Sequence, residues 1–356
     1  MTTARERAGD FCTRYGLTAP VLGAPMAGAC PPELAAAVAG AGGMGAAGVV
    51  NDSPEKIAGW AARYRELSGG PFQLNLWVPD APGPGSGPGT ASGTAEVAGF
   101  LDSLGGHAAP PAGSAPDFEA QCAAALAARP TAVSSIMGVF DDTYVAALHD
   151  AGIAWFACAT TLAEALAAQR AGADVVVAQG MEAGGHRGTT DPDAAERTTV
   201  GLFALVPQLA DALSVPVVAA GAVADGRSLA AALTLGASAV QVGSALLRAP
   251  ETGIDAGWAA ALEGLAPEDT VPTRAYTGRL ARAIPTAYVR AWAEPDAPVP
   301  ARYPQQRRLV ARYRAGEPGA VDRVNHWAGQ AAGRAGAEPA WEIVARMWRD
   351  ADALLP

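Results

Sequence analysis

The sequence predicts an α/β protein built as a (β/α)₈ barrel, with a smaller, mostly helical subdomain over the mouth at the C-terminal ends of the strands. Short apolar runs rich in β-branched residues alternate with Ala/Leu-rich stretches of helical spacing. Strand–helix alternation implies parallel strands joined by right-handed crossovers, and eight such units close naturally into a barrel. An open doubly wound sheet is the alternative, which chain length alone does not exclude.

The expected elements follow from these runs and from the Gly, Pro and capping residues between them. Residues 54–67, for example, follow Ser53 as a helix N-cap and begin with Pro54. Strands are expected at residues 20–26, 43–50, 71–77, 131–135, 153–157, 174–178, 215–220 and 238–242. Helices are expected at residues 32–40, 54–67, 117–128, 142–149, 161–171, 200–213 and 226–235.

The chain divides into three parts. Residues 1–247 form the expected barrel, interrupted at 79–116 by a low-complexity insertion of Pro, Gly, Ser and Ala to which we assign no structure. Residues 248–317 break the alternation and carry many aromatic residues and arginines, so we expect a helical subdomain that covers the substrate. Residues 318–356 are expected to form helices, around 325–330 and 340–354, that pack back on the barrel.

Composition excludes several classes of function. The formal net charge of -10 argues against nucleic acid or anionic membranes as partners. Lysine occurs once, at Lys56 in an expected helix start, which disfavours Schiff-base chemistry. The four cysteines and four histidines have no metal-type spacing, so we expect no metal and a reduced, cytoplasmic setting. The N-terminal residues lack the apolar core of a signal peptide, and we expect no membrane span.

The strongest candidate for a catalytic segment is the stretch QGMEAGGHRG at residues 179–188. It follows an expected buried strand and ends in a loop of small residues around His186. Glycines let the backbone approach a ligand closely, and histidine is the side chain whose unperturbed pKa lies near neutrality. A barrel carries its active site at the ends of the strands, so His186 is the first candidate for catalysis.

The last two strands end in turns that suit a phosphate. Gly221 and Ala222 follow the seventh strand, and Gly243 and Ser244 follow the eighth, each turn leading into a helix. Helix N-termini offer free N–H groups and a positive dipole end, and barrels often bind phosphate at this position. Either glycine alone could simply make a tight turn, but the pair favours a phosphate site.

Other strand ends offer groups for a flat ring. Asn75 and Gln179 are side-chain amides that could pair with the imide edge of a flavin. The first strand ends at Ala24, Pro25 and Met26, whose backbone could lie against such a ring. A phosphate at one end and amides at the other are what flavin mononucleotide (FMN) requires.

Together these motifs resemble the nitronate monooxygenase family, formerly called 2-nitropropane dioxygenases, which are FMN-dependent TIM-barrel flavoenzymes. The barrel motifs are GAPMAG at 23–28, GGMG at 42–45, QLN at 73–75, QGMEAGGH at 179–186, VAAG at 218–221 and QVGS at 241–244. Further motifs follow the barrel: TGRLAR at 277–282, YPQQR at 303–307 and WAGQ at 327–330. The resemblance covers nearly the whole chain outside the low-complexity insertion.

The resemblance implies roles for individual residues, with His186 as the catalytic residue. The residues expected to hold the isoalloxazine are Ala24, Pro25, Met26, Asn75 and Gln179, with Gly184 and Gly185 beside it. The phosphate would be held by Gly221, Ala222, Gly243 and Ser244. Trp327 and Gln330 would touch the flavin from the C-terminal side. The expected substrate-facing groups are Tyr276, Tyr303 and Arg307. Residues 134–138 (SSIMG) depart from the aromatic- or His-containing stretch expected of the family, which leaves the substrate open.

The implied reaction is oxidation of an alkyl nitronate, of the propionate 3-nitronate type, or of a nitroalkane, by FMN and O₂ to a carbonyl compound and nitrite. His186 would hold the nitronate, or act as base toward a nitroalkane. The alternatives are an FMN-dependent enoyl-acyl-carrier-protein reductase that uses NAD(P)H, and a flavoprotein of a biosynthetic pathway, with or without turnover. A barrel of the IMP-dehydrogenase type is disfavoured, because no cysteine follows the sixth strand. The oligomeric state is open, with a homodimer among the options.

Overall fold

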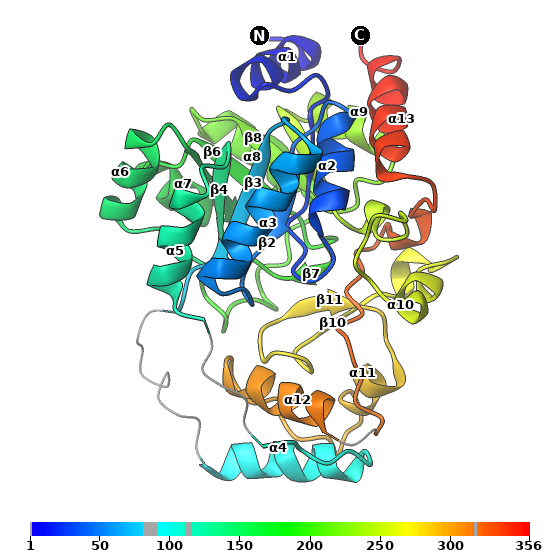
Figure 1. The fold of residues 1–356 in the computed structure, drawn as a ribbon. Coiled ribbons are helices and arrows are strands. Elements are labelled where there is room, and N and C mark those ends of the chain that lie inside the picture. The colour runs from blue at the N-terminus through cyan, green and yellow to red at the C-terminus, as the bar shows by residue number, and fades with distance from the viewer. Residues whose placement is uncertain (1, 81–90, 111–115, 317–318) are drawn as a thin grey trace.

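Eight parallel strands form a barrel, as the sequence predicts. The structure is a computed structural model that describes residues 2–80, 91–110, 116–316 and 319–356 (Figure 1). The barrel strands are β1 (Val21–Gly23), β2 (Gly45–Gly48), β3 (Phe72–Trp77), β4 (Ala132–Ile136), β5 (Ala154–Ala159), β6 (Val175–Gln179), β8 (Val217–Ala220) and β9 (Ala239–Val242). They run in the order β1-β9-β8-β6-β5-β4-β3-β2, and a parallel bridge between Leu22 and Met44 joins the two ends. This closure rules out the open-sheet alternative.

Helices surround the barrel. The outer helices are α2 (Pro32–Gly40), α3 (Pro54–Leu67), α5 (Phe118–Ala127), α6 (Asp142–Asp150), α7 (Leu162–Arg170), α8 (Leu202–Ala212) and α9 (Gly226–Thr234). Helix α3 begins after the predicted cap Ser53, as α6 and α7 begin after Asp141 and Thr161. Ser53, Asp141 and Thr161 each accept a hydrogen bond from a backbone N–H of the first turn. Across the described ranges, no helix is long and apolar enough to cross a membrane.

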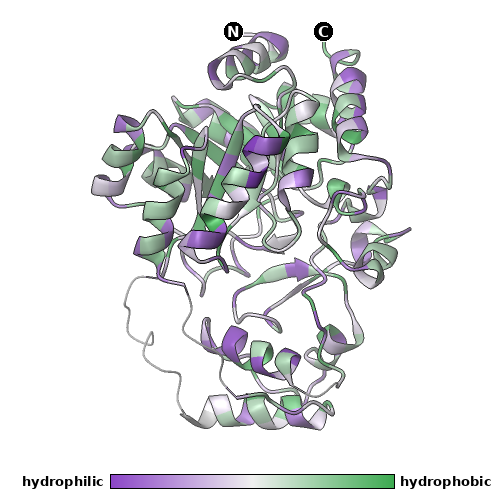
Figure 2. Ribbon diagram, viewed as in Figure 1, coloured by the Kyte–Doolittle hydropathy of each residue, from purple (hydrophilic) through white to green (hydrophobic). Residues whose placement is uncertain are grey.

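The end of the barrel away from the strands' C-termini is closed by α1 (Ala4–Tyr15). Phe11 and Tyr15 of this helix pack on Phe156 inside the barrel, with ring centroids 6.4 and 5.1 Å apart. Figure 1 shows α1 at one end of the barrel and the subdomain at the other, and Figure 2 shows the strands between them coloured as hydrophobic. Access to the barrel interior is therefore from the subdomain side.

The subdomain over the mouth contains a small sheet as well as the expected helices. Its helices are α10 (Ala256–Ala261), α11 (Ala287–Ala291) and α12 (Gln305–Ala315). Between them, β10 (Val271–Thr273) and β11 (Ala281–Ala283) pair antiparallel, and β11 also pairs with β7 (Gly185–His186). The motif loop is thus the third strand of the sheet, and Ala281 lies opposite His186.

Two segments differ from the expectation. The insertion contains α4 (Ala91–Ser103), which packs on α12 with Val97 and Leu101 fully buried, whereas residues 81–90 and 111–115 lie outside the described part. Residues 325–330 form no helix: Trp327 makes an antiparallel bridge to Ala283. The second expected C-terminal helix exists as α13 (Ala340–Asp352) and packs on α9 and α2.

Candidate active site

A single cavity lies where the C-terminal ends of the strands meet the subdomain. Most of the residues selected from the sequence line it, although they come from five strand ends and two later segments. The lining includes Ala24, Pro25, Met26, Asn75, Gln179, Gly184, Gly185, His186, Gly221, Ala222, Gly243, Ser244, Arg307 and Trp327. Tyr276, Tyr303 and Gln330 are not among the lining residues.

His186 is held by three segments that are distant in the sequence. Its Nε2 lies 2.9 Å from Thr277 Oγ1, in the turn before β11. Its ring meets Trp77 at 4.5 Å and Trp327 at 4.9 Å between centroids, both edge to face. The imidazole therefore lies between two indole rings, and its Nε2 is hydrogen-bonded to the Thr277 hydroxyl.

The site pairs a neutral imidazole with a permanent cation. Burial, and then the nearby Arg307 guanidinium, lower the pKa of His186 to about 3, so the ring is neutral at pH 7. Arg307 lines the same cavity; it donates to the Tyr303 hydroxyl at 3.2 Å and also binds Asn51 Oδ1. An anion entering the cavity meets one positive charge and one neutral ring.

Gln179 shapes the motif loop. Its Nε2 donates to the carbonyl of His186 at 2.9 Å, and its Oε1 accepts from the backbone N–H of Gly188 at 2.8 Å. Arg187 adds a bond from Nη1 to the Gln179 carbonyl at 2.7 Å. Both ends of this amide are thus engaged within the loop, and the loop conformation depends on it.

Asn75 has a free acceptor. Its Nδ2 donates to Ser134 Oγ at 3.0 Å, whereas Oδ1 has no hydrogen-bond partner among the described residues. Asn75 lines the cavity, so this oxygen is available to a ligand donor.

The turns after β8 and β9 supply free backbone donors. Gly221 has φ +130° and Ala222 φ +51°, so the chain bends sharply as it leaves β8. In the described chain, the N–H groups of Gly221, Ala222 and Ser244 have no hydrogen-bond acceptor, and all three residues line the cavity. Unpaired N–H groups on one wall make a site for an anion.

The glycines of the motif also allow two segments of backbone to touch. A Cβ on Gly184 would lie 2.5 Å from the nitrogen of Gly329, and one on Gly329 would lie 2.8 Å from the nitrogen of Gly184. Ser244 Oγ accepts the Gly329 N–H at 3.0 Å, and the Gln330 N–H donates to the Glu182 carbonyl at 2.9 Å. This contact holds Trp327 against His186, and Gln330 contributes to it through its backbone.

Tyr276 lies behind the cavity wall. It is 1% exposed, its hydroxyl donates to Asp322, and its ring packs edge to face on Trp327 at 5.0 Å. The expectation that it faces substrate is wrong, because Trp327 stands between it and the cavity. Tyr303 is also outside the lining but contacts Trp77 at 5.7 Å and holds Arg307.

Sequence reasoning missed Trp77 and Thr277. Trp77 lies two residues after Asn75 on β3, and alternate residues of a strand share a face, so the pattern could have revealed it. Thr277 opens the TGRLAR motif, but its approach to His186 joins segments 91 residues apart. No local pattern predicts that contact.

Comparisons with known proteins agree with this architecture. The model of the nitronate monooxygenase family matches residues 11–350. A nitronate monooxygenase of Paraburkholderia phytofirmans is 39% identical over 94% of this chain and 93% of its own. The crystal structure of a nitroalkane oxidase from Streptomyces ansochromogenes superposes with a TM-score of 0.85 at 33% identity, over 97% of this chain and 98% of its own.

A more distant neighbour is FabK from Thermotoga maritima, with a TM-score of 0.74 and 25% identity over 97% of this chain and 96% of its own. The sequence relatives favour the nitronate monooxygenases over FabK. With the family model spanning nearly the whole barrel and subdomain, the chain belongs to the nitronate monooxygenase family and is an oxidoreductase.

Proposed function

We propose that this protein binds FMN and oxidises alkyl nitronates of the propionate 3-nitronate type with O₂, giving a carbonyl compound and nitrite. The observation that carries this proposal is the pairing of neutral His186 with cationic Arg307 in a cavity that is also lined by residues with free backbone N–H groups. His186 and Arg307 suit a nitronate, and the backbone N–H groups suit a phosphate.

The residues present fit FMN. The unpaired N–H groups of Gly221, Ala222 and Ser244 would bind the phosphate, and Asn75 Oδ1 would accept from the ring imide. The backbone groups of Ala24 and Met26 are already hydrogen-bonded, to the Val242 carbonyl and within their own turn, so these residues would meet the ring through van der Waals contact. When bound, FMN supplies the redox chemistry, accepting two electrons from the substrate and returning them to O₂.

The charges of the site favour a nitronate over a neutral nitroalkane. A nitronate has already lost its α-proton, so it needs a hydrogen-bond donor and a counter-charge, which neutral His186 and Arg307 provide. An imidazole with a pKa of about 3 is a weak base for removing a proton from carbon. Trp77, Trp327 and Ile136 surround the site with apolar surface, which excludes water and strengthens these interactions.

The test is oxygen consumption and nitrite release by the FMN-loaded protein with propionate 3-nitronate. We expect turnover with the nitronate, weaker turnover with the parent nitroalkane, and no need for NAD(P)H. Rapid NAD(P)H oxidation with an enoyl thioester, and none of the nitronate reaction, would assign the protein to the reductase alternative instead.

A further inference from the structure

The contact between Thr277 and His186 decides which ring nitrogen carries the proton. Thr277 Oγ1 is 2.9 Å from His186 Nε2, and it also accepts the Arg279 backbone N–H at 3.3 Å. The other acceptor for the hydroxyl proton is the Arg279 carbonyl, at the longer distance of 3.4 Å. The hydroxyl can give its one proton to Nε2, or it can give it to the Arg279 carbonyl and accept an Nε2–H. At 3.4 Å the carbonyl is the poorer acceptor, which favours donation to Nε2. Nε2 is then the acceptor, and the ring proton resides on Nδ1.

The second ring nitrogen is free for a ligand. Within the described residues, His186 Nδ1 has no hydrogen-bond partner, and His186 lines the cavity. With its proton on Nδ1, the neutral ring donates one hydrogen bond into the cavity. In the other tautomer, Nδ1 would instead present a lone pair, which repels an anion.

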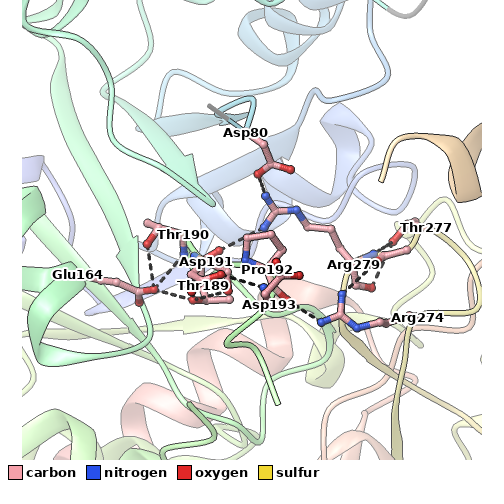
Figure 3. A network of polar contacts seen from close by, with 11 residues as sticks. Asp80, Glu164, Thr189, Thr190, Asp191, Pro192, Asp193, Arg274, Thr277 and Arg279 are labelled. Atoms are coloured by element: carbon pink, nitrogen blue, oxygen red, sulfur yellow. Dashed lines mark hydrogen bonds and ion pairs between the residues drawn. The ribbon is translucent and has the colours of Figure 1, made fainter. Parts of the chain in front are cut away.

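The turn that carries Thr277 is fixed from several sides. Arg279 is 3% exposed; it pairs with Asp80 and donates to the Thr189 carbonyl at 3.2 Å. Arg274 donates to the Gly278 carbonyl at 2.8 Å and to the Pro192 carbonyl at 2.6 Å. Figure 3 shows Thr277 beside Arg279 and Arg274, whose side chains reach toward the loop of residues 189–193 that follows the motif.

Gly278, next to Thr277, completes this rigid turn. It has φ +84°, and a Cβ there would collide with the Ala301 carbonyl. Thr277 itself is 5% exposed. The hydroxyl is therefore presented to Nε2 by a turn with little freedom to move.

We infer that Thr277 is a positioning residue: its hydroxyl holds His186 as the Nδ1–H tautomer, so that the ring donates a hydrogen bond to the nitronate rather than presenting a lone pair to it. This inference rests on the proposed function for the identity of the anion, but the tautomer itself is a property of the protein alone. The lowered pKa of His186 agrees with it, because a ring that stays neutral has a defined tautomer over the working pH range.

The experiment is ¹⁵N NMR of the full-length protein with labelled histidine, with His186→Asn used to identify the His186 signals. In wild type we expect a protonated Nδ1 and an unprotonated, hydrogen-bonded Nε2 at pH 7. Thr277→Val, which keeps the shape and removes the hydroxyl, should populate both tautomers. It should also lower kcat/KM for propionate 3-nitronate by about tenfold, the size of one hydrogen bond. Thr277→Ser should restore both wild-type properties.

Thr189→Val is the matched control. Thr189 is 2% exposed and its hydroxyl binds Glu164, so the variant also loses a buried hydroxyl in this network but does not touch His186. It should keep the wild-type tautomer. A protonated Nε2 in wild type, or the same tautomer in Thr277→Val as in wild type, would overturn the inference. A correct tautomer in a protein that turns over no nitronate would instead refute the proposed function alone.

Discussion

The two ends of the cavity are built by different means. The end at β8 and β9 consists of backbone N–H groups at Gly221, Ala222 and Ser244. Their position is set by where these two barrel strands end. The end at His186 consists of side chains, and its neighbours Trp77, Thr277 and Trp327 come from three separate parts of the chain. We infer that the first end binds any suitable phosphate, whereas the second selects the substrate. The following predictions test that division.

Replacing His186 should have the largest effect. His186→Asn removes the neutral ring from the side-chain end and should lower kcat/KM for propionate 3-nitronate by about 10²–10³-fold, the usual loss for a donor to a reacting anion. The visible spectrum should still show bound FMN, because the backbone end is unchanged. Loss of the flavin together with activity would contradict the separation of the two ends.

The second-largest expected effect is weaker substrate binding when the charge of Arg307 is removed. Arg307→Gln deletes the cation of the cavity and should raise KM for the anionic nitronate by about tenfold, with a smaller change in kcat. Arg308→Gln, at the exposed neighbour, is the control and should leave KM unchanged. A KM that responds equally in both variants would show that only the general surface charge matters.

The contact between the motif loop and the C-terminal segment can be broken by one methyl group. Gly184→Ala places a Cβ 2.5 Å from the Gly329 nitrogen and should destabilise the protein by about 1–3 kcal/mol in chemical unfolding. Gly69→Ala is the control, because Gly69, like Gly184, has no positive φ, and its Cβ would meet nothing within 4 Å. If the two variants lose equal stability, the backbone contact has no special importance.

Ser244 should affect the phosphate end more than the ring of the flavin. Ser244→Ala leaves the backbone N–H in place but removes a hydroxyl that accepts from Gly329 and is free to donate to phosphate. FMN affinity should fall about fivefold, whereas riboflavin, which lacks the phosphate, should bind as before. Equal losses for both flavins would place the phosphate elsewhere.

The last expected effect is on stability against pH. The folded pKa of His186, about 3, is below the unfolded value near 6.5, so between these values the unfolded chain binds a proton that the folded chain does not. The unfolding free energy contributed by this residue therefore falls as pH drops below 6.5 and is constant above it. The melting temperature of wild type relative to His186→Asn should decrease from pH 7 to pH 5. A difference that does not change with pH would mean that His186 titrates normally.

The sequence was a good guide where function depends on local backbone. The apolar runs predicted all eight barrel strands, and the glycine turns predicted residues that line the cavity, because a glycine after a buried strand constrains the chain locally. It was a poor guide where distant segments meet. β10 and β11 have three residues each, too few for a periodic signal. Tyr276 was expected to face the substrate, but its ring packs against Trp327, which lines the cavity in its place.

Helix α4 is an intermediate case. Val97 and Leu101 stand four residues apart, which is helical spacing, but the surrounding Gly, Ser and Pro concealed it. The approach of Gly184 to Gly329 joins residues far apart in the chain, and no local pattern contains it.

Anaerobic mixing of the FMN-loaded protein with propionate 3-nitronate tests the central claim most directly. If His186 and Arg307 hold a nitronate in the cavity that binds FMN, the flavin absorbance should bleach in a single phase. The apparent Kd should rise in Arg307→Gln, and the bleaching rate should fall in His186→Asn. A flavin that stays oxidised with the nitronate but is reduced by NADPH would contradict the account.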